Sequence, residues 1–281
     1  MATLLDGAAL AGEIKAQVAA EIKKAGINPG LAVVIVGENP ASRIYVDYKK
    51  KDCAECGIRS EEFALSAEAG EDALLACIAA LNRRADIHGI LVQQPLPAGY
   101  DERKVLQAIS PDKDVDAFHP VNVGRIVSGD YAFLPCTPAG VLALLDHYGI
   151  NPKGRHCVVV GRSDIVGKPQ AMLLLHRDAT VTICHSKTLD LGHFTRQADI
   201  LVAAVGKENL ITADMVKPGA VVIDVAMNKN AAGKLCGDVD FPAVEPIASY
   251  ITPVPGGVGP MTRAILMRNT LEATQNAASV L

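Results

Sequence analysis

Short apolar runs rich in Val and Ile recur along the chain and alternate with segments of helical periodicity. The runs lie at residues 31–36, 88–92, 156–160, 179–184, 199–205 and 219–225. Strands that are buried on both faces form such continuous hydrophobic runs, and their alternation with helices is typical of parallel sheets covered on both sides. The pattern therefore predicts an α/β fold.

A proline-rich stretch from about 111 to 140 separates two groups of these runs. Pro111, Pro120, Pro135 and Pro138 favour extended or turning backbone there over one long helix. The length of 281 residues also exceeds the usual size of one domain. We therefore predict two domains with a boundary near the end of this stretch. The final segment, from Met261, has the pattern of a helix that either domain could accept.

The composition favours a small-molecule ligand. A net charge of -4, a pI near 6.0 and an aromatic content of 4% lack the basic patches and stacking platforms of a nucleic-acid binder. The N-terminus has no secretory signal pattern, and no segment has the roughly 18 uncharged apolar residues of a membrane span. We expect a cytoplasmic protein that contacts neither nucleic acid nor membrane.

The seven cysteines predict reduced thiols rather than a disulfide framework, because they are odd in number and widely spread. Cys53 and Cys56 form a lone CxxC, which we interpret as ordinary buried helix residues. Asp112, Asp114 and Asp116 resemble the opening of a calcium loop, but the glycine and glutamate that such a loop needs are missing. We expect no metal site.

The run at 156–160 leads into a glycine-punctuated turn and then a helical segment. The turn is Gly161-Arg162-Ser163-Asp164-Ile165-Val166-Gly167-Lys168-Pro169. Glycines let backbone approach a diphosphate, and a helix N-terminus presents free N–H groups to it. Because the spacing is not GxGxxG, an ordinary strand-to-helix turn is the alternative.

The end of the strand predicted at 179–184 indicates which dinucleotide is bound. An NAD-binding fold usually has an acidic residue there, but this strand runs into His185-Ser186-Lys187. Together with Arg162, these side chains would suit a 2′-phosphate, which needs positive charge and hydroxyl donors. We therefore predict that the cofactor is NADP. The alternatives are that Arg162 is a solvated loop residue and that His185 only makes structural hydrogen bonds at the end of the strand.

In the first half, Asn39-Pro40 and Gly57 predict a helix over about 40–56. Tyr45 and Lys49 then share one face and form a candidate proton-handling pair. Because Lys49 begins a run of three lysines, a solvated surface is the alternative.

Two polar residues near strand ends are candidates for the same site. Gln93 follows a strand and could orient a substrate or a lysine, or simply end the strand. Asp116 could anchor a polar heterocycle through its N–H groups, or belong to a solvated acidic loop.

Taken together, these segments closely resemble the bifunctional methylenetetrahydrofolate dehydrogenase/methenyltetrahydrofolate cyclohydrolase family along essentially the whole chain. The motifs that carry the resemblance are SRIYVDYKKK at 42–51, GILVQQPLP at 89–97, KDVDAFHP at 113–120, PCTPAG at 135–140, GRSDIVGKP at 161–169, CHSKT at 184–188 and ITPVPGGVGPMT at 251–262. The last segment is far more specific than a lone glycine loop.

The resemblance implies the chemistry: NADP-dependent oxidation of 5,10-methylenetetrahydrofolate and hydrolysis of the methenyl product to 10-formyltetrahydrofolate, within one-carbon metabolism and purine biosynthesis. It implies that Lys49 is the central catalytic residue, that Tyr45 contacts the substrate ring, that Gln93 tunes Lys49 and that Asp116 anchors the pterin. Further substrate contacts are expected at Pro255, Gly256 and Gly257. The expected cofactor-binding residues are Thr137, Gly161, Arg162, Ser163, Val166, Gly167, His185, Ser186 and Gly206.

The resemblance also implies a homodimer whose chains each have two domains with a cleft between them. Residues 1–137 would form an α/β catalytic domain, completed by a C-terminal helix at 262–281. Residues 138–261 would form a Rossmann-like cofactor domain with a parallel sheet.

Two positions depart from the family pattern. Ala117 and Ala226 stand where glycine is usual, and alanine would be strained if either backbone requires positive φ.

Three other functions compete with this interpretation. The first is a monofunctional dehydrogenase, and the second is a non-catalytic NADP-binding module. The third, a short-chain dehydrogenase that uses Tyr45 and Lys49, fails because its YxxxK motif follows the cofactor loop, whereas here it precedes that loop.

Overall fold

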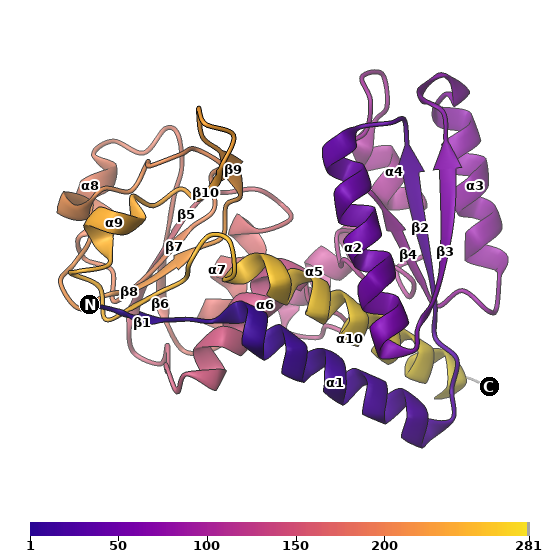
Figure 1. Ribbon diagram of the computed structural model, residues 1–281, viewed down its shortest axis with the longest axis horizontal. Helices are drawn as coiled ribbons and strands as arrows, with labels where there is room; N and C mark the ends of the chain where they lie inside the picture. The colour runs from indigo at the N-terminus through magenta and orange to yellow at the C-terminus, as the bar shows by residue number, and fades with distance from the viewer. Residues whose placement is uncertain (280–281) are drawn as a thin grey trace. The chain divides into compact units, whose positions relative to one another are not determined.

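The computed structural model describes residues 1–279, and the chain folds into two compact units (Figure 1). The six-stranded unit comprises Met1–Ala11, Ile126–Asp130 and Thr137–Thr262. The three-stranded unit comprises Gly12–Arg125, Tyr131–Cys136 and the chain from Arg263 onward. None of the helices within residues 1–279 is both long and apolar enough to cross a membrane.

The three-stranded unit is built on a parallel sheet of order β3-β2-β4. Its strands are β2 (Gly30–Val36), β3 (Arg59–Leu65) and β4 (Gly89–Val92). The helices that lie wholly within it are α2 (Pro40–Cys56), α3 (Glu71–Arg83) and α4 (Glu102–Ala108), and a short 3-10 helix, η1, spans Ala67–Ala69. Apolar side chains of β2, β4, α3 and α4 form its core.

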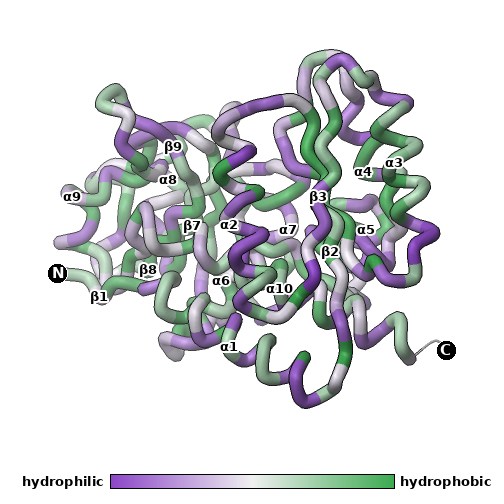
Figure 2. The backbone as a smooth tube through the Cα atoms, turned by 45° about the vertical axis from the view of Figure 1, so that its right-hand side comes forward, coloured by the Kyte–Doolittle hydropathy of each residue, from purple (hydrophilic) through white to green (hydrophobic). Residues whose placement is uncertain are grey.

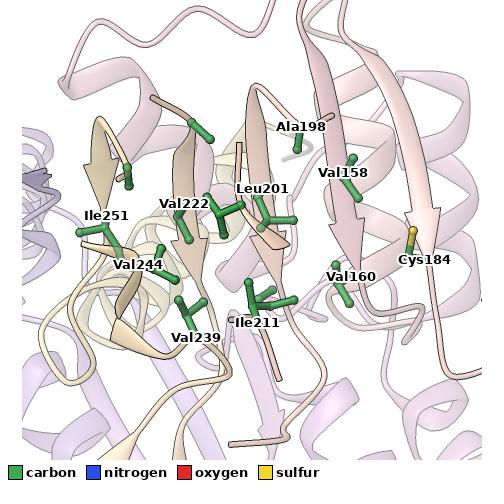
Figure 3. Packing of buried hydrophobic residues seen from close by; sticks show 14 residues of the cluster. Val158, Val160, Cys184, Ala198, Leu201, Ile211, Val222, Val239, Val244 and Ile251 are labelled. Carbon is green, nitrogen blue, oxygen red and sulfur yellow. The ribbon is translucent and has the colours of Figure 1, made fainter. Parts of the chain in front are cut away.

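The six-stranded unit is built on a parallel sheet of order β1-β11-β8-β7-β5-β6. The strands are β1 (Thr3–Leu4), β5 (His156–Val160), β6 (Thr180–Cys184), β7 (Ile200–Ala203), β8 (Val221–Asp224) and β11 (Tyr250–Ile251). Figure 3 shows part of the core, where Val158, Leu201, Val222 and Ile251 project from four of these strands.

Short helices and a hairpin complete the six-stranded unit. They are α7 (Gly167–Leu175), α8 (Leu191–Thr195), α9 (Phe241–Val244), the 3-10 helix η2 (Ala213–Met215), and an antiparallel hairpin of β9 (Asn228–Lys229) and β10 (Leu235–Cys236). Four helices contain residues of both units: α1 (Gly7–Ala25), α5 (Pro120–Ser128), α6 (Cys136–His147) and α10 (Val258–Ser279).

The six apolar runs predicted as strands are confirmed as β2, β4, β5, β6, β7 and β8. The α/β prediction is therefore also confirmed. Pattern reasoning missed β3, whose polar start Arg59-Ser60-Glu61-Glu62 contrasts with the apolar β2 (Figure 2). Because β3 is an edge strand and is only partly buried, it tolerates polar side chains that the fully buried β2 excludes.

The observed units differ from the predicted ranges at Met1–Ala11 and Ile126–Asp130, whereas the boundary between Thr262 and Arg263 lies one residue from the predicted one. Met1–Ala11 belongs to the six-stranded unit, because β1 pairs with β11 through Thr3↔Tyr250 and Leu4↔Ile251. The last helix begins at Val258, before the predicted 262, since proline at position 260 is tolerated in a first helical turn. The last two residues of the predicted range 262–281 lie outside the described residues.

Candidate functional site

Helix α2 positions two of the candidate residues of the three-stranded unit. The side chain of Asn39 accepts the backbone N–H of Ser42 at 3.1 Å and so caps the helix, and Gly57, with φ 76°, ends it. The predicted helix over 40–56 is thereby confirmed. Tyr45 and Lys49 are one turn apart on it, as the pattern required.

The ammonium group of Lys49 is held by the amide of Gln93. Its Nζ donates to Oε1 of Gln93 at 3.0 Å. The other end of that amide is also fixed, because Nε2 of Gln93 donates to the carbonyl oxygen of Gln94 at 2.7 Å. The alternative of a solvated lysine fits its exposed neighbour Lys50, which pairs with Glu62, but not Lys49.

Burial changes the pKa values of Lys49 and of the titratable groups around it. Removal of the ammonium from water lowers the pKa of Lys49, and the negative charge of Asp116 only partly opposes this effect. Burial raises the pKa of Asp116, and it raises the pKa of the Cys136 thiol well above its usual value. The site therefore favours uncharged forms, and a lysine in it can exchange protons more readily than one in water.

Residues distant in sequence position the segment that carries Asp116. The Sγ atom of Cys136 lies 3.4 Å from Oδ1 of Asp116. The buried amide of Asn269, on α10, donates to the carbonyl oxygens of Val115 at 2.7 Å and Leu134 at 2.9 Å. Neither Cys136 nor Asn269 was identified from sequence, since each acts through contacts that span the chain.

Ala117 follows Asp116 with φ 57° and is fully buried. The family's usual glycine would adopt this left-handed conformation without strain. Ala226, the second departure from the family pattern, is not among the positive-φ residues of the described chain. Only the first departure therefore strains the backbone.

An arginine on α10 faces the tyrosines of α2. The guanidinium of Arg263 lies 4.8 Å from the ring centroid of Tyr48, and its Nη1 is 3.1 Å from Oδ2 of the buried Asp52. Its positive charge contributes to lowering the pKa of Lys49. Tyr45, on the same helix, is 36% exposed.

Asp114, in the same acidic segment, has a structural role. Its Oδ2 accepts the backbone N–H of His119 at 2.7 Å and the side-chain N–H of Asn122 at 2.8 Å. Among residues 1–279, no group of three or more His, Cys, Asp and Glu side chains could hold a metal ion.

In the six-stranded unit, the loop after β5 is closely packed. A Cβ atom on Gly161, whose φ is 134°, would lie 2.3 Å from the carbonyl oxygen of Ala204. A Cβ atom on Gly167 would lie 2.3 Å from the carbonyl oxygen of Gly161. Oγ of Ser163 accepts the N–H groups of Val166 at 3.2 Å and Gly167 at 3.3 Å, which closes the turn onto α7. Glycine is required at both positions.

The loops after β5 and β6 adjoin, because the N–H of Gly161 donates to the carbonyl oxygen of Cys184 at 2.9 Å. Arg162, Ser186 and Lys187 are exposed there, while Nδ1 of His185 accepts the N–H of Lys187 at 3.1 Å. A guanidinium, a hydroxyl and an ammonium without a strand-end carboxylate make a donor set that fits a 2′-phosphate.

The remaining predicted residues also lie in the six-stranded unit. Oγ1 of Thr137 is 2.9 Å from Oγ1 of Thr262. A Cβ atom on Gly7 would lie 1.8 Å from the carbonyl oxygen of Gly257, so Gly256 and Gly257 pack directly on the start of α1. Gly206, with φ 79°, lies in the loop after β7.

Two family models match the chain. The model described as the catalytic domain of tetrahydrofolate dehydrogenase/cyclohydrolase matches residues 5–116, and the NAD(P)-binding domain of the same family matches residues 135–278.

Individual relatives match over nearly their whole length. The bifunctional protein FolD of Ruminiclostridium cellulolyticum is 58% identical over 97% of each chain, and that of Paracidovorax citrulli is 56% identical over 99% of each. The crystal structure of the Campylobacter jejuni bifunctional enzyme FolD has a TM-score of 0.96 at 49% identity, covering 98% of this chain and 99% of that one. The Trypanosoma brucei enzyme, complexed with NADP and inhibitor, has a TM-score of 0.93 at 39% identity, covering 99% and 98%.

Proposed function

Because this chain belongs to the tetrahydrofolate dehydrogenase/cyclohydrolase family, we propose that it oxidises 5,10-methylenetetrahydrofolate with NADP and hydrolyses the methenyl product to 10-formyltetrahydrofolate. Family matches to both parts of the chain and relatives above 55% identity along nearly its full length support both reactions. The observation that carries the assignment is the half-buried Lys49, whose Nζ donates to Oε1 of Gln93 at 3.0 Å.

Lys49 is the proton-transfer residue of the hydrolysis. The reaction adds water to the cationic methenyl carbon, breaks one of its two C–N bonds and releases one proton. A lysine whose pKa burial has lowered can accept a proton from the attacking water and return one to the departing nitrogen. Gln93 keeps the amine in one orientation without adding charge.

Asp116 and Tyr45 bind the folate in this proposal. The carboxyl group of Asp116 is held beside Cys136, where it can bind the N–H groups of the pterin ring. Tyr45 offers an exposed aromatic face to the substrate ring. Pro255, Gly256 and Gly257 supply further backbone contacts. In this proposal the three-stranded unit supplies Tyr45, Lys49 and Asp116 to the folate, whereas Pro255, Gly256 and Gly257 belong to the six-stranded unit.

The six-stranded unit is the NADP domain. NADP, when bound, accepts the hydride that leaves the methylene carbon. The close-packed glycine turn from Gly161 to Gly167 leads from β5 into α7, the place where a dinucleotide's diphosphate binds in this kind of fold. In this proposal Thr137, Ser163, Val166 and Gly206 also contact the cofactor. Arg162 and Ser186 hold the 2′-phosphate, with His185 ordering their loop.

We further propose that the enzyme is a cytoplasmic homodimer whose product serves purine biosynthesis. Strand β6 is one of the two outer strands of its sheet and contains Ile183, which is 37% exposed; this suits pairing with a second copy. The seven cysteines are free thiols, as expected in a reducing compartment.

The direct test supplies methylenetetrahydrofolate with NADP or NAD and follows reduced nicotinamide and methenyl product together. Methenyltetrahydrofolate without any cofactor is tested in parallel. We expect oxidation that prefers NADP, and hydrolysis that needs no cofactor. Oxidation without hydrolysis would identify a monofunctional dehydrogenase, and NADP binding without turnover would identify a non-catalytic module.

A further inference from the structure

A carboxylate from a distant segment holds the loop that follows β7. Asp238 is fully buried, and it accepts three consecutive backbone N–H groups, from Val205 at 2.6 Å, Gly206 at 3.1 Å and Lys207 at 2.6 Å. The side-chain amide of Asn228 donates a fourth hydrogen bond at 3.0 Å.

Burying a carboxylate and several backbone N–H groups costs free energy unless each of them has a hydrogen-bond partner. An isolated carboxylate inside a protein loses its hydration, and three N–H groups without an acceptor would each be destabilising. Here the charge and the donors compensate one another, as in the backbone concavities that bind anions. Three consecutive N–H groups of the loop therefore share this one side chain as their acceptor.

Asp238 is itself fixed by a second buried carboxylate at the end of β8. Asp224 accepts the backbone N–H groups of Asp238 at 3.0 Å and Val239 at 2.9 Å. A Cβ atom on Gly237 would lie 1.8 Å from Oδ2 of Asp224, so only glycine fits there. The two carboxylates thus connect the carboxyl ends of β8 and β7.

The loop that Asp238 holds adjoins the glycine turn after β5. The carbonyl oxygen of Ala204 is the atom that leaves no room for a side chain on Gly161. The carboxyl ends of the strands in an open α/β sheet are where ligands bind. Displacement of this loop would therefore alter the surface offered to a dinucleotide.

We propose that Asp238 is a positioning residue of the cofactor site, which preorganises the loop Val205–Lys207 for NADP without touching the folate chemistry. The proposal rests on the NADP site assigned above. No contact between Asp238 and the cofactor is required, because the carboxylate acts through the loop's N–H groups.

The test is Asp238→Asn, which keeps the side chain's size but removes its charge and turns an NH₂ group toward backbone donors. We expect the dissociation constant of NADP, measured by calorimetry without folate, to rise about tenfold, because the loop must then be ordered on binding. Amide hydrogen exchange at Val205, Gly206 and Lys207 should accelerate. Methenyl hydrolysis without cofactor should keep its wild-type rate and pH profile.

Two variants serve as controls. Asp240→Asn makes the same change two residues further along, where the side chain does not cap α9, and should leave NADP affinity unchanged. Asn228→Ala removes one of the four hydrogen bonds and should weaken NADP binding about threefold. If Asp238→Asn fails to fold, Asn228→Ala decides the question by the same measurements.

The outcomes separate this proposal from the proposed function. Unchanged NADP affinity in a folded Asp238→Asn protein overturns the positioning role. Equal losses of NADP binding and cofactor-free hydrolysis also overturn it, because they indicate a general structural role. Failure of the wild-type protein to bind NADP instead overturns the assignment of the cofactor site.

Discussion

The two units differ in how far their charged and titratable side chains are exposed to water. Around Lys49, in the three-stranded unit, titratable groups are withdrawn from water and their pKa values move toward the neutral forms. In the six-stranded unit, Arg162, Ser186 and Lys187 remain exposed, and the buried carboxylate of Asp238 is surrounded by N–H donors. Proton transfer near neutral pH needs a lowered lysine pKa, whereas phosphate recognition needs cations that stay charged. Substitutions should therefore alter rates in one unit and affinities in the other.

The largest effect is expected for Lys49→Ala. Loss of the only proposed proton-transfer amine should slow methenyl hydrolysis about a thousandfold, while NADP affinity stays unchanged. Stopped-flow absorbance with methenyltetrahydrofolate and calorimetry with NADP measure the two quantities. Lys50→Ala is the matched control, because its exposed ammonium pairs with Glu62. Undiminished hydrolysis by the Lys49 variant would exclude the mechanism.

In the other unit, Arg162→Ala should weaken NADP about 30-fold and NAD hardly at all, because only NADP carries the 2′-phosphate. Binding titrations with both dinucleotides give the ratio. Lys168→Ala removes a nearby cation that pairs with Asp164 and should change neither affinity. Equal losses for the two dinucleotides would refute the phosphate assignment.

The charge environment of Lys49 can be tested with Gln93→Glu. A carboxylate beside the ammonium favours its charged form and raises the lysine pKa, so less free amine is present at neutral pH. Hydrolysis at pH 7 should fall about tenfold, and the rising limb of the pH–rate profile should move up by about one pH unit. Gln93→Met lowers the rate without that upward shift. A Glu variant whose profile does not move would contradict the role of Lys49 as base.

The smallest expected effects are changes in stability at Ala117 and Ala226, the two alanines that replace the family's usual glycines. Ala117→Gly should stabilise the protein by about 0.5–1 kcal/mol, because it relieves a left-handed conformation at φ 57°. Ala226→Gly should destabilise it by about 0.5 kcal/mol, since glycine there only adds freedom to the unfolded chain. Urea unfolding measures both changes. If the free energy of unfolding changed with the same sign in both variants, backbone strain would not be what distinguishes the two positions.

Much of the fold could be predicted from local pattern. The apolar runs identified β2, β4, β5, β6, β7 and β8, and Asn39-Pro40 with Gly57 identified the bounds of α2. Strand β3 was missed because one edge strand can carry Glu61 and Glu62 within an otherwise buried sheet. Strands β1 and β11 were missed because two residues each are too short to produce a period.

The candidate site was only partly predictable. The residues Lys49, Gln93 and Asp116 were identified, and the contact between the first two was anticipated. Asp238, Asn269 and Arg263 were not, because a buried carboxylate and an amide or arginine within a helix have no distinguishing local pattern.

By itself, the sequence determined properties that depend on near neighbours: the apolar strands, the capped helix, the glycine turn and the missing carboxylate at the end of β6. Only the tertiary structure decided which of three adjacent lysines is half-buried against Gln93 and which carboxylate accepts the N–H groups of the loop after β7. Desolvation and the convergence of donors require partners from elsewhere in the chain. Gln93 is 44 positions from Lys49, and Gly206 is 32 from Asp238.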